Sequence, residues 1–150
     1  MASYYGSHQT AAGTNLTVVV LASTAAVVGQ IHQLIIGSDA TPADIATEFA
    51  VLRHTVAAVG GTALTEKPSN PLRAAASCVL TGGTMTEPTY EAVATEGLLQ
   101  IALNQRATYT WIANPGRELV TASGTANGIG LRSVASGGTP NINASLAWDE

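Results

Sequence analysis

The sequence predicts an all-β protein whose strands form a single antiparallel β-sandwich. Short runs of β-branched and other apolar residues recur along the chain, and Gly, Pro and Asn turn residues separate them. Length gives a further indication, because 150 residues suit one domain with its own core. About eight such runs favour a jelly-roll-like sandwich, although the same spacing is also compatible with a barrel.

The first residues differ in composition from those that follow. Residues 1–14 are polar, contain glycine and include the adjacent Tyr4 and Tyr5. We therefore expect an extended N-terminal arm, a kind of segment that is usually mobile unless a neighbour holds it. Residues 15–150 would then make up the β-sandwich domain.

Strands are expected at several places in that domain. Asn15–Ala22 carries apolar residues on both faces, as a buried strand does, and Val27–Ile36 follows as a second strand. Ala74–Leu80 is a shorter candidate, and Asn141–Trp148 alternates between apolar and polar residues. The stretch Leu98–Leu131 has the pattern strand, turn, strand, turn, strand, with breaks at Asn-Gln-Arg, Asn-Pro-Gly and Asn-Gly sequences.

The segment from residue 41 to residue 59 fits either a helix or a strand. Residues 41–44 have the Thr-Pro-Ala-Asp sequence of a helix N-terminus. Apolar residues then recur at helical spacing: Ile45, Phe49, Leu52, Val56 and Val59. From Ala46 the chain also alternates between two faces, and periodicity alone does not decide between these readings. We favour a strand over residues 46–55, because the other expected elements are strands.

Few residues are charged. The charged fraction is 11%, against roughly 25% in an average soluble domain, and the mean hydropathy is +0.23. So few charges would leave an isolated monomer poorly protected against association. We infer that copies of the chain or a partner cover part of its surface.

The composition also argues against several classes of partner and location. A net charge of −4 with Lys67 as the single lysine provides no basic patch for nucleic acid. Polar residues interrupt the apolar stretch Leu16–Ile36, so no membrane span is expected. The first residues lack the positive region of a signal peptide. Cys78, the single cysteine, favours synthesis in a reducing compartment.

No group of residues predicts an enzyme, a cofactor site or a metal site. Cys78 would need His54 or His32 as a base, yet its small apolar neighbours favour a buried structural thiol. The histidines, which also include His8, lack the spacing of metal ligands. The carboxylates lack the Asp-x-Asp loop of a calcium site.

Aromatic and arginine side chains are the better candidates for function, because they are enriched where proteins meet partners. Arginines at strand ends, together with acidic residues, would supply charge pairs between subunits. For the tryptophans core packing is the simpler interpretation, whereas for the tyrosines of the arm we favour contact with a partner. The predicted partner or oligomer interface comprises Tyr4, Tyr5, Arg106, Tyr109, Arg117, Glu118 and Trp148.

Several motifs from Ile35 onward resemble those of small virion structural proteins of tailed phages. The resemblance is to the head decoration or cement type, and the motifs are turn and strand-end residues rather than a catalytic signature. They lie at residues 37–44, 87–90, 102–108, 111, 115–116, 118–119 and 125–131.

This resemblance implies a protein made in the host cytoplasm and located on the capsid surface of the virion. It implies binding to the phage major capsid protein as an oligomer, with a homotrimer expected, and stabilisation of the head. A receptor- or glycan-binding module of a tail or spike is the alternative, in which exposed aromatic rings would stack on sugars.

Overall fold

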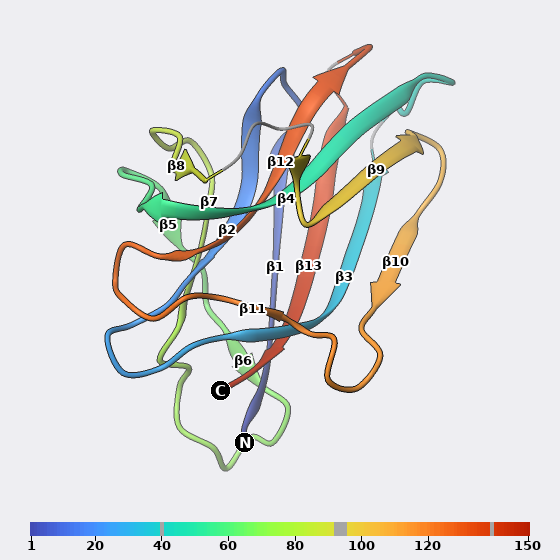
Figure 1. The fold of residues 1–150 in the computed structure, drawn as a ribbon. Helices are drawn as coiled ribbons and strands as arrows, with labels where there is room; N and C mark the ends of the chain where they lie inside the picture. The colour runs from blue at the N-terminus through green and yellow to red at the C-terminus, as the bar shows by residue number, and fades with distance from the viewer. Residues whose placement is uncertain (40, 92–95, 139) are drawn as a thin grey trace.

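The computed structural model describes residues 1–39, 41–91, 96–138 and 140–150. The regular elements within these ranges are strands, and they form two antiparallel sheets that pack together (Figure 1). The predicted all-β antiparallel sandwich is confirmed, while the finer jelly-roll assignment stays a prediction. Among the described residues no helix has the length and apolarity needed to cross a membrane.

The six-stranded sheet, here called sheet A, contains both ends of the chain. Its strands, in spatial order, are β10 (Tyr109–Ile112), β3 (Gln30–Asp39), β13 (Asn141–Asp149), β1 (Ser3–Ala11) and β6 (Lys67–Pro68), and β11 (Leu119–Val120) also pairs with β3.

The seven-stranded sheet, here called sheet B, is made of strands that lie between residue 16 and residue 136. Its strands, in spatial order, are β5 (Thr62–Ala63), β7 (Val79–Gly82), β2 (Leu16–Ala22), β12 (Gly128–Ser136), β4 (Ala46–Val56) and β8 (Thr89–Tyr90), and β9 (Leu99–Asn104) also pairs with β4.

The segment that fitted both helix and strand is strand β4, as favoured from the sequence. It pairs with β12 on one side and with β9 on the other. Phe49 and Val51 belong to the core between the sheets, whereas Ala50 and Leu52 are buried on the opposite face. Because both faces of the strand are covered, apolar residues occupy consecutive positions instead of alternate ones. Some of them therefore also fall at helical spacing.

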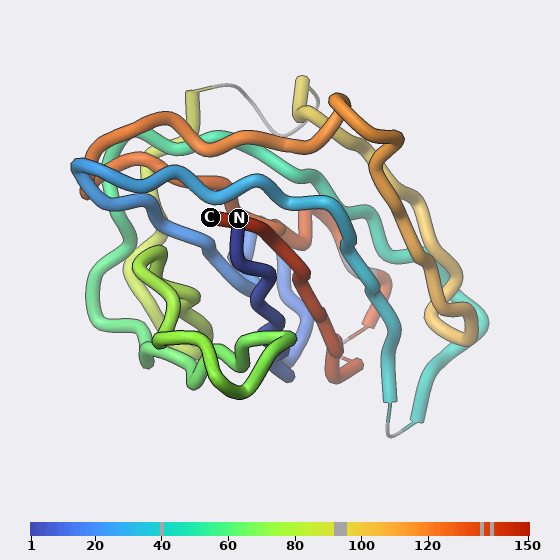
Figure 2. The backbone as a smooth tube through the Cα atoms, turned by 90° about the horizontal axis from the view of Figure 1, so that it is seen from below, coloured from blue at the N-terminus to red at the C-terminus, as the bar shows by residue number. Residues whose placement is uncertain are grey.

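The structure corrects the expected N-terminal arm. Residues 3–11 form β1, which pairs with β13 along its whole length, from Ser3 opposite Asp149 to Ala11 opposite Asn141. The two ends of the chain therefore lie side by side (Figure 2). The segment is polar because alternate side chains face outward, and that alternation gave it the composition of an arm.

Other strand boundaries differ from the expected ones by a few residues. The strand expected from Val27 begins at Gln30, because the Thr24 hydroxyl oxygen accepts the Val27 N–H at 3.0 Å and holds a turn there. The strand expected at residues 74–80 is β7, at residues 79–82. The strands expected at residues 15–22 and 141–148 are β2 and β13, which lie where they were expected.

The core lies between the two sheets and includes Trp148, the largest fully buried side chain. Its ring stacks on Tyr4, with ring centroids 6.0 Å apart. Gly6 lies two residues after Tyr4 on the same strand, and a Cβ there would lie 2.2 Å from Leu80 Cδ2, so a larger residue would require Leu80 to shift. Close approach of β1 to sheet B thus depends on a glycine.

The predicted strands of residues 98–131 exist, but they are divided between the two sheets. β9 pairs with β4 in sheet B, whereas β10 pairs with β3 in sheet A. The turn at residues 104–106 therefore joins the two layers at one side of the sandwich (Figure 1). This arrangement makes β10 an edge strand of sheet A.

Candidate binding surfaces

Strand β10 brings together several residues that were predicted to contact a partner. Tyr109 begins the strand, and Arg106 lies in the turn before it. Arg117 and Glu118 lie in the turn after it. Both arginines are exposed, and neither forms an ion pair within the described ranges. Residues 106–118 are called the β10 edge below.

The backbone of β10 is open on one side. Among the described residues it pairs with β3 alone. The Ala113 N–H donates to the His32 carbonyl at 2.9 Å, so antiparallel alternation turns the Trp111 backbone toward β3 as well. The N–H and C=O groups of Thr110 and Ile112 consequently point away from the sheet. Natural edges are usually protected by a short strand, charge, proline or a bulge, and β10 is short, at four residues, but has no charged side chain, proline or bulge.

The side chains of β10 alternate between core and solvent. Tyr109 and Trp111 are half-buried and pack against the core. Thr110 and Ile112 face outward, and Ile112 is 66% exposed. An exposed isoleucine beside an open backbone edge is a surface to which another strand can add.

The turn that precedes β10 is held by side-chain hydrogen bonds. Asn104 Oδ1 accepts the Arg106 N–H at 2.9 Å. Gln105 is buried, and its amide accepts the Ala43 N–H at 3.0 Å and donates to Thr47 Oγ1 at 3.2 Å. These bonds fix the position of Arg106 relative to the strand.

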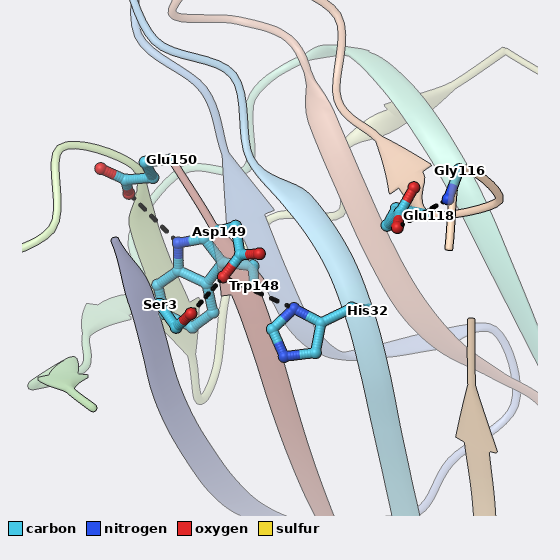
Figure 3. Close-up of polar contacts among 7 residues, drawn as sticks. All are labelled: Ser3, His32, Gly116, Glu118, Trp148, Asp149 and Glu150. Carbon is cyan, nitrogen blue, oxygen red and sulfur yellow. Dashed lines mark hydrogen bonds and ion pairs between the residues drawn. The ribbon is translucent and has the colours of Figure 1, made fainter. Parts of the chain in front are cut away.

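The turn that follows β10 uses Glu118 as a structural residue. Gly116 has a φ of +79°, a conformation that favours glycine, and its N–H donates to Glu118 Oε1 at 3.0 Å (Figure 3). The N–H groups of Glu118 itself and of Gly116 hold the pKa of the Glu118 carboxyl below its usual value. The acid is thus engaged within the turn, which leaves Arg117 as the free charge there.

Tyr4 and Trp148, both predicted as interface residues, are buried in the core of this chain, and the prediction is corrected for them. The register places them opposite each other on the inner face of sheet A. Tyr4 Oη donates to the Ala74 carbonyl at 3.2 Å. Trp148 Nε1 donates to Glu150 Oε1 at 3.1 Å (Figure 3). The rings stabilise the fold and are not available to a partner.

Tyr5, the neighbouring residue, lies on the outer face of sheet A and is 46% exposed. Register pairing places it in one row across the sheet. From the β10 edge to β6 this row is Ile112, Gln33, Ala147, Tyr5 and Lys67. The next row is Thr110, Ile35, Ser145 and Ser7. Lys67 is the one charged side chain of these two rows.

A hollow of about 410 Å³ opens on this outer face. Its lining includes Tyr5, Gln33, Lys67 and Ser145, and the sequence analysis singled out Tyr5 alone as a site residue. These residues come from separate strands, and only the strand order places them together. The polar alternation of β13 was the available signal in the sequence, but alternation does not identify neighbouring strands.

The cysteine and the histidines that were considered for catalysis or metal binding occupy separate environments. Burial raises the pKa of the Cys78 thiol to about 12, which disfavours the thiolate. His54 Nδ1 lies 2.9 Å from the Ala126 carbonyl oxygen, and His32 Nδ1 lies 3.8 Å from Asp149 Oδ1 (Figure 3). Within the described ranges no three His, Cys, Asp or Glu side chains form a group that could hold a metal ion.

No protein-family model, curated protein or solved structure matches the chain. The resemblance to tailed-phage virion proteins therefore stays a prediction, and the site is defined by its geometry.

Proposed function

We propose that this protein is a decoration or cement protein, which binds the major capsid protein on the outside of a tailed-phage head. The observation that carries the proposal is the open β10 edge, where the backbone groups of Thr110 and Ile112 point away from sheet A. The motif resemblance suggests the kind of particle, and the β10 edge suggests the contact.

Strand addition explains how such an edge would bind. A strand of the capsid protein would pair with β10 through main-chain hydrogen bonds, and Ile112 would lose its exposed apolar surface. Arg106 and Arg117, at opposite ends of β10, are exposed and make no ion pair in the described part of the chain. The edge therefore suits a strand flanked by acidic residues, despite the net charge of −4.

Repetition would make a modest contact sufficient. A head offers many equivalent binding positions, and a homotrimer would present several β10 edges at once, so that weak contacts act together. The low charge content supports a chain with a large covered surface. The proposed role is one of binding and stabilisation without catalysis, which the raised pKa of Cys78 supports.

Replacement of Thr110 by proline tests the contact. Thr110→Pro removes one outward N–H but no hydrogen bond to β3, and proline is tolerated at such edge positions. A lost hydrogen bond of about 1.4 kcal/mol per contact corresponds to an approximately tenfold loss of affinity. Rebinding of the purified variant to heads stripped of this protein should therefore fall at least about tenfold.

Thr110→Val is the matched control, because it keeps the N–H and the side-chain shape while removing the hydroxyl. It should rebind like the unmodified chain, and thermal melting should show that both variants are folded. Equal rebinding of Thr110→Pro and Thr110→Val would show that β10 is not the contact. Absence of this protein from the purified virion would overturn the function itself.

A receptor- or glycan-binding module of a tail or spike is the second candidate. The hollow beside Tyr5 favours it, because an exposed aromatic ring next to amide and hydroxyl groups suits a sugar. Copy number separates the two functions. Quantitative mass spectrometry of purified virions should find hundreds of copies of a decoration protein but only a handful of a spike module.

A further inference from the structure

The hollow on the outer face of sheet A has a floor of small side chains between taller walls. Ser145 and Ala147, on the central strand β13, form the floor. Gln33 of β3 lies on one side of Ala147 and Tyr5 of β1 on the other, with Lys67 of β6 beyond Tyr5. The volume of about 410 Å³ lies within the range of small-molecule sites, roughly 300–1,000 Å³.

Among the described residues, the polar side chains of the hollow make no side-chain hydrogen bond, unlike those at the two ends of β1. At the two ends of β1, Ser3 donates to Asp149 and Gln9 donates to Asp39. Between them, Tyr5 and Ser7 make no side-chain hydrogen bond within the described residues. The same is true, over the described ranges, of the Gln33 amide, the Ser145 hydroxyl and the Lys67 ammonium.

The chemistry of these free groups selects a class of ligand. The amide and hydroxyls offer both donors and acceptors, as a polyhydroxylated molecule requires. The Tyr5 ring offers an apolar face against which the C–H face of a sugar ring can pack. Lys67 adds one positive point charge at the rim, which suits a carboxylate. A phosphate group would favour an arginine fork or several cations, and this hollow contains a single lysine.

We propose that this hollow binds an acidic saccharide unit, with the sugar ring on Tyr5, hydroxyls on Gln33 and Ser145, and the carboxylate on Lys67. The inference does not rest on the β10 contact. A decoration protein with this site would bind carbohydrate while it is seated on the head, and a spike module would use it as its main site.

Nuclear magnetic resonance titration of the full chain tests the site with a matched pair of probes. D-glucuronic acid and D-glucose differ in the carboxylate that Lys67 is proposed to bind. D-glucuronic acid should give saturable shifts of the amide signals of Tyr5, Ser7, Gln33 and Lys67. D-glucose should shift the same signals with an affinity about two- to fivefold weaker, as expected for one exposed charge pair.

Single substitutions test the roles of the floor and wall residues of the hollow separately. Ser145→Tyr fills the floor and should abolish saturable binding of both sugars, and Tyr5→Leu should weaken both if the filled variant does not fold. Lys67→Met should remove the preference for D-glucuronic acid and leave the binding of D-glucose unchanged. Asn143→Ala is the matched control, because Asn143 is an exposed residue of the same strand outside the hollow.

Several results would overturn the proposal. One is the absence of saturable shifts for either sugar, and another is a set of shifts located at β10 instead of the hollow. Equal affinity for the two sugars, unchanged in Lys67→Met, would overturn the acidic character of the ligand. Thr110→Pro should bind both sugars like the unmodified chain, so a failure at the β10 edge and a failure here are distinguishable.

Discussion

The outer faces of the two sheets differ in their exposure to solvent: residues of the chain cover the outer face of sheet B, whereas the outer face of sheet A is open. The segment Glu87–Tyr90 ends in edge strand β8 of sheet B, and its side chains extend over the outer face of that sheet, so it is called the covering segment below. The Tyr90 hydroxyl would be 2.5 Å from a Cβ at Gly130. Val20 and Leu52, the register partners of Gly130, are only 2% and 1% exposed. The outer face of sheet A is open, with Tyr5 and Ile112 exposed.

Polar groups follow the same division. On sheet B, the Glu87 carboxylate accepts the Thr17 N–H at 2.8 Å and the Thr17 hydroxyl, and it lies 3.8 Å from the Arg132 Nε atom. The Arg132 guanidinium lies 5.4 Å from the centre of the Tyr90 ring. On sheet A, Tyr5 and Lys67 have no such partner among the described residues. The chain covers the outer face of sheet B with its own residues. The outer face of sheet A is therefore the better candidate for binding.

Substitution of Leu52 on the outer face of sheet B should have the largest effect on stability. Leu52→Ala removes a side chain that is buried on the outer face of sheet B, so the free energy of unfolding should fall by about 2–5 kcal/mol. Urea unfolding followed by tryptophan fluorescence measures the change. A loss below about 1 kcal/mol would mean that the outer face of sheet B is not a second packed layer.

Glu87 should have the next largest effect, because it fastens the covering segment to sheet B. Glu87→Ala leaves the Thr17 N–H without its acceptor and leaves the Thr17 hydroxyl with Tyr90 Oη alone, and it should destabilise the fold by about 1–3 kcal/mol. Glu87→Gln keeps an acceptor oxygen and should cost less. If the two variants unfold at the same urea concentration, these hydrogen bonds do not hold the segment.

Acid should lower the free energy of unfolding through His54 of sheet B. Burial lowers the pKa of His54 below its usual value of about 6.5, so the folded state favours the neutral ring. The stabilisation is complete above about pH 6.5 and is lost progressively as the pH falls through the lowered folded pKa.

His54→Gln should therefore lose less stability than the unmodified chain when urea unfolding is compared at pH 7.5 and pH 5. Burial lowers the pKa of His8 as well, so His8→Gln should also lose less stability than the unmodified chain between these two pH values. An unchanged difference between the two pH values in His54→Gln would show that His54 does not contribute to the acid sensitivity.

Ile112 should show the smallest effect on folding. Ile112→Ala shortens an exposed side chain on the outer face of sheet A, and its free energy of unfolding should change by no more than about 0.5 kcal/mol. The same variant should bind stripped heads more weakly, because the proposed contact buries this side chain. A large loss of stability would show that Ile112 serves the fold instead.

Local patterns predicted strands well wherever alternation or a buried run was clear. The segment beginning at Ala46 was interpreted correctly, because its neighbours were strands, although the periodicity itself also fitted a helix. Patterns failed at the N-terminus, where outward residues such as Ser7 and Gln9 hid the inward positions of Tyr4 and Gly6. The candidate site was found in part: the residues around β10 came together, whereas Tyr4 and Trp148 proved to be core.

The sequence by itself determined the class of the fold, the approximate strands and the low charge content, because periodicity and composition are local properties. Only the tertiary structure decided that β9 and β10 belong to different sheets, that β10 is an open edge, and that Gln33, Ser145 and Lys67 meet at one hollow. Strand order and register depend on pairing between distant segments, and no local pattern specifies that pairing.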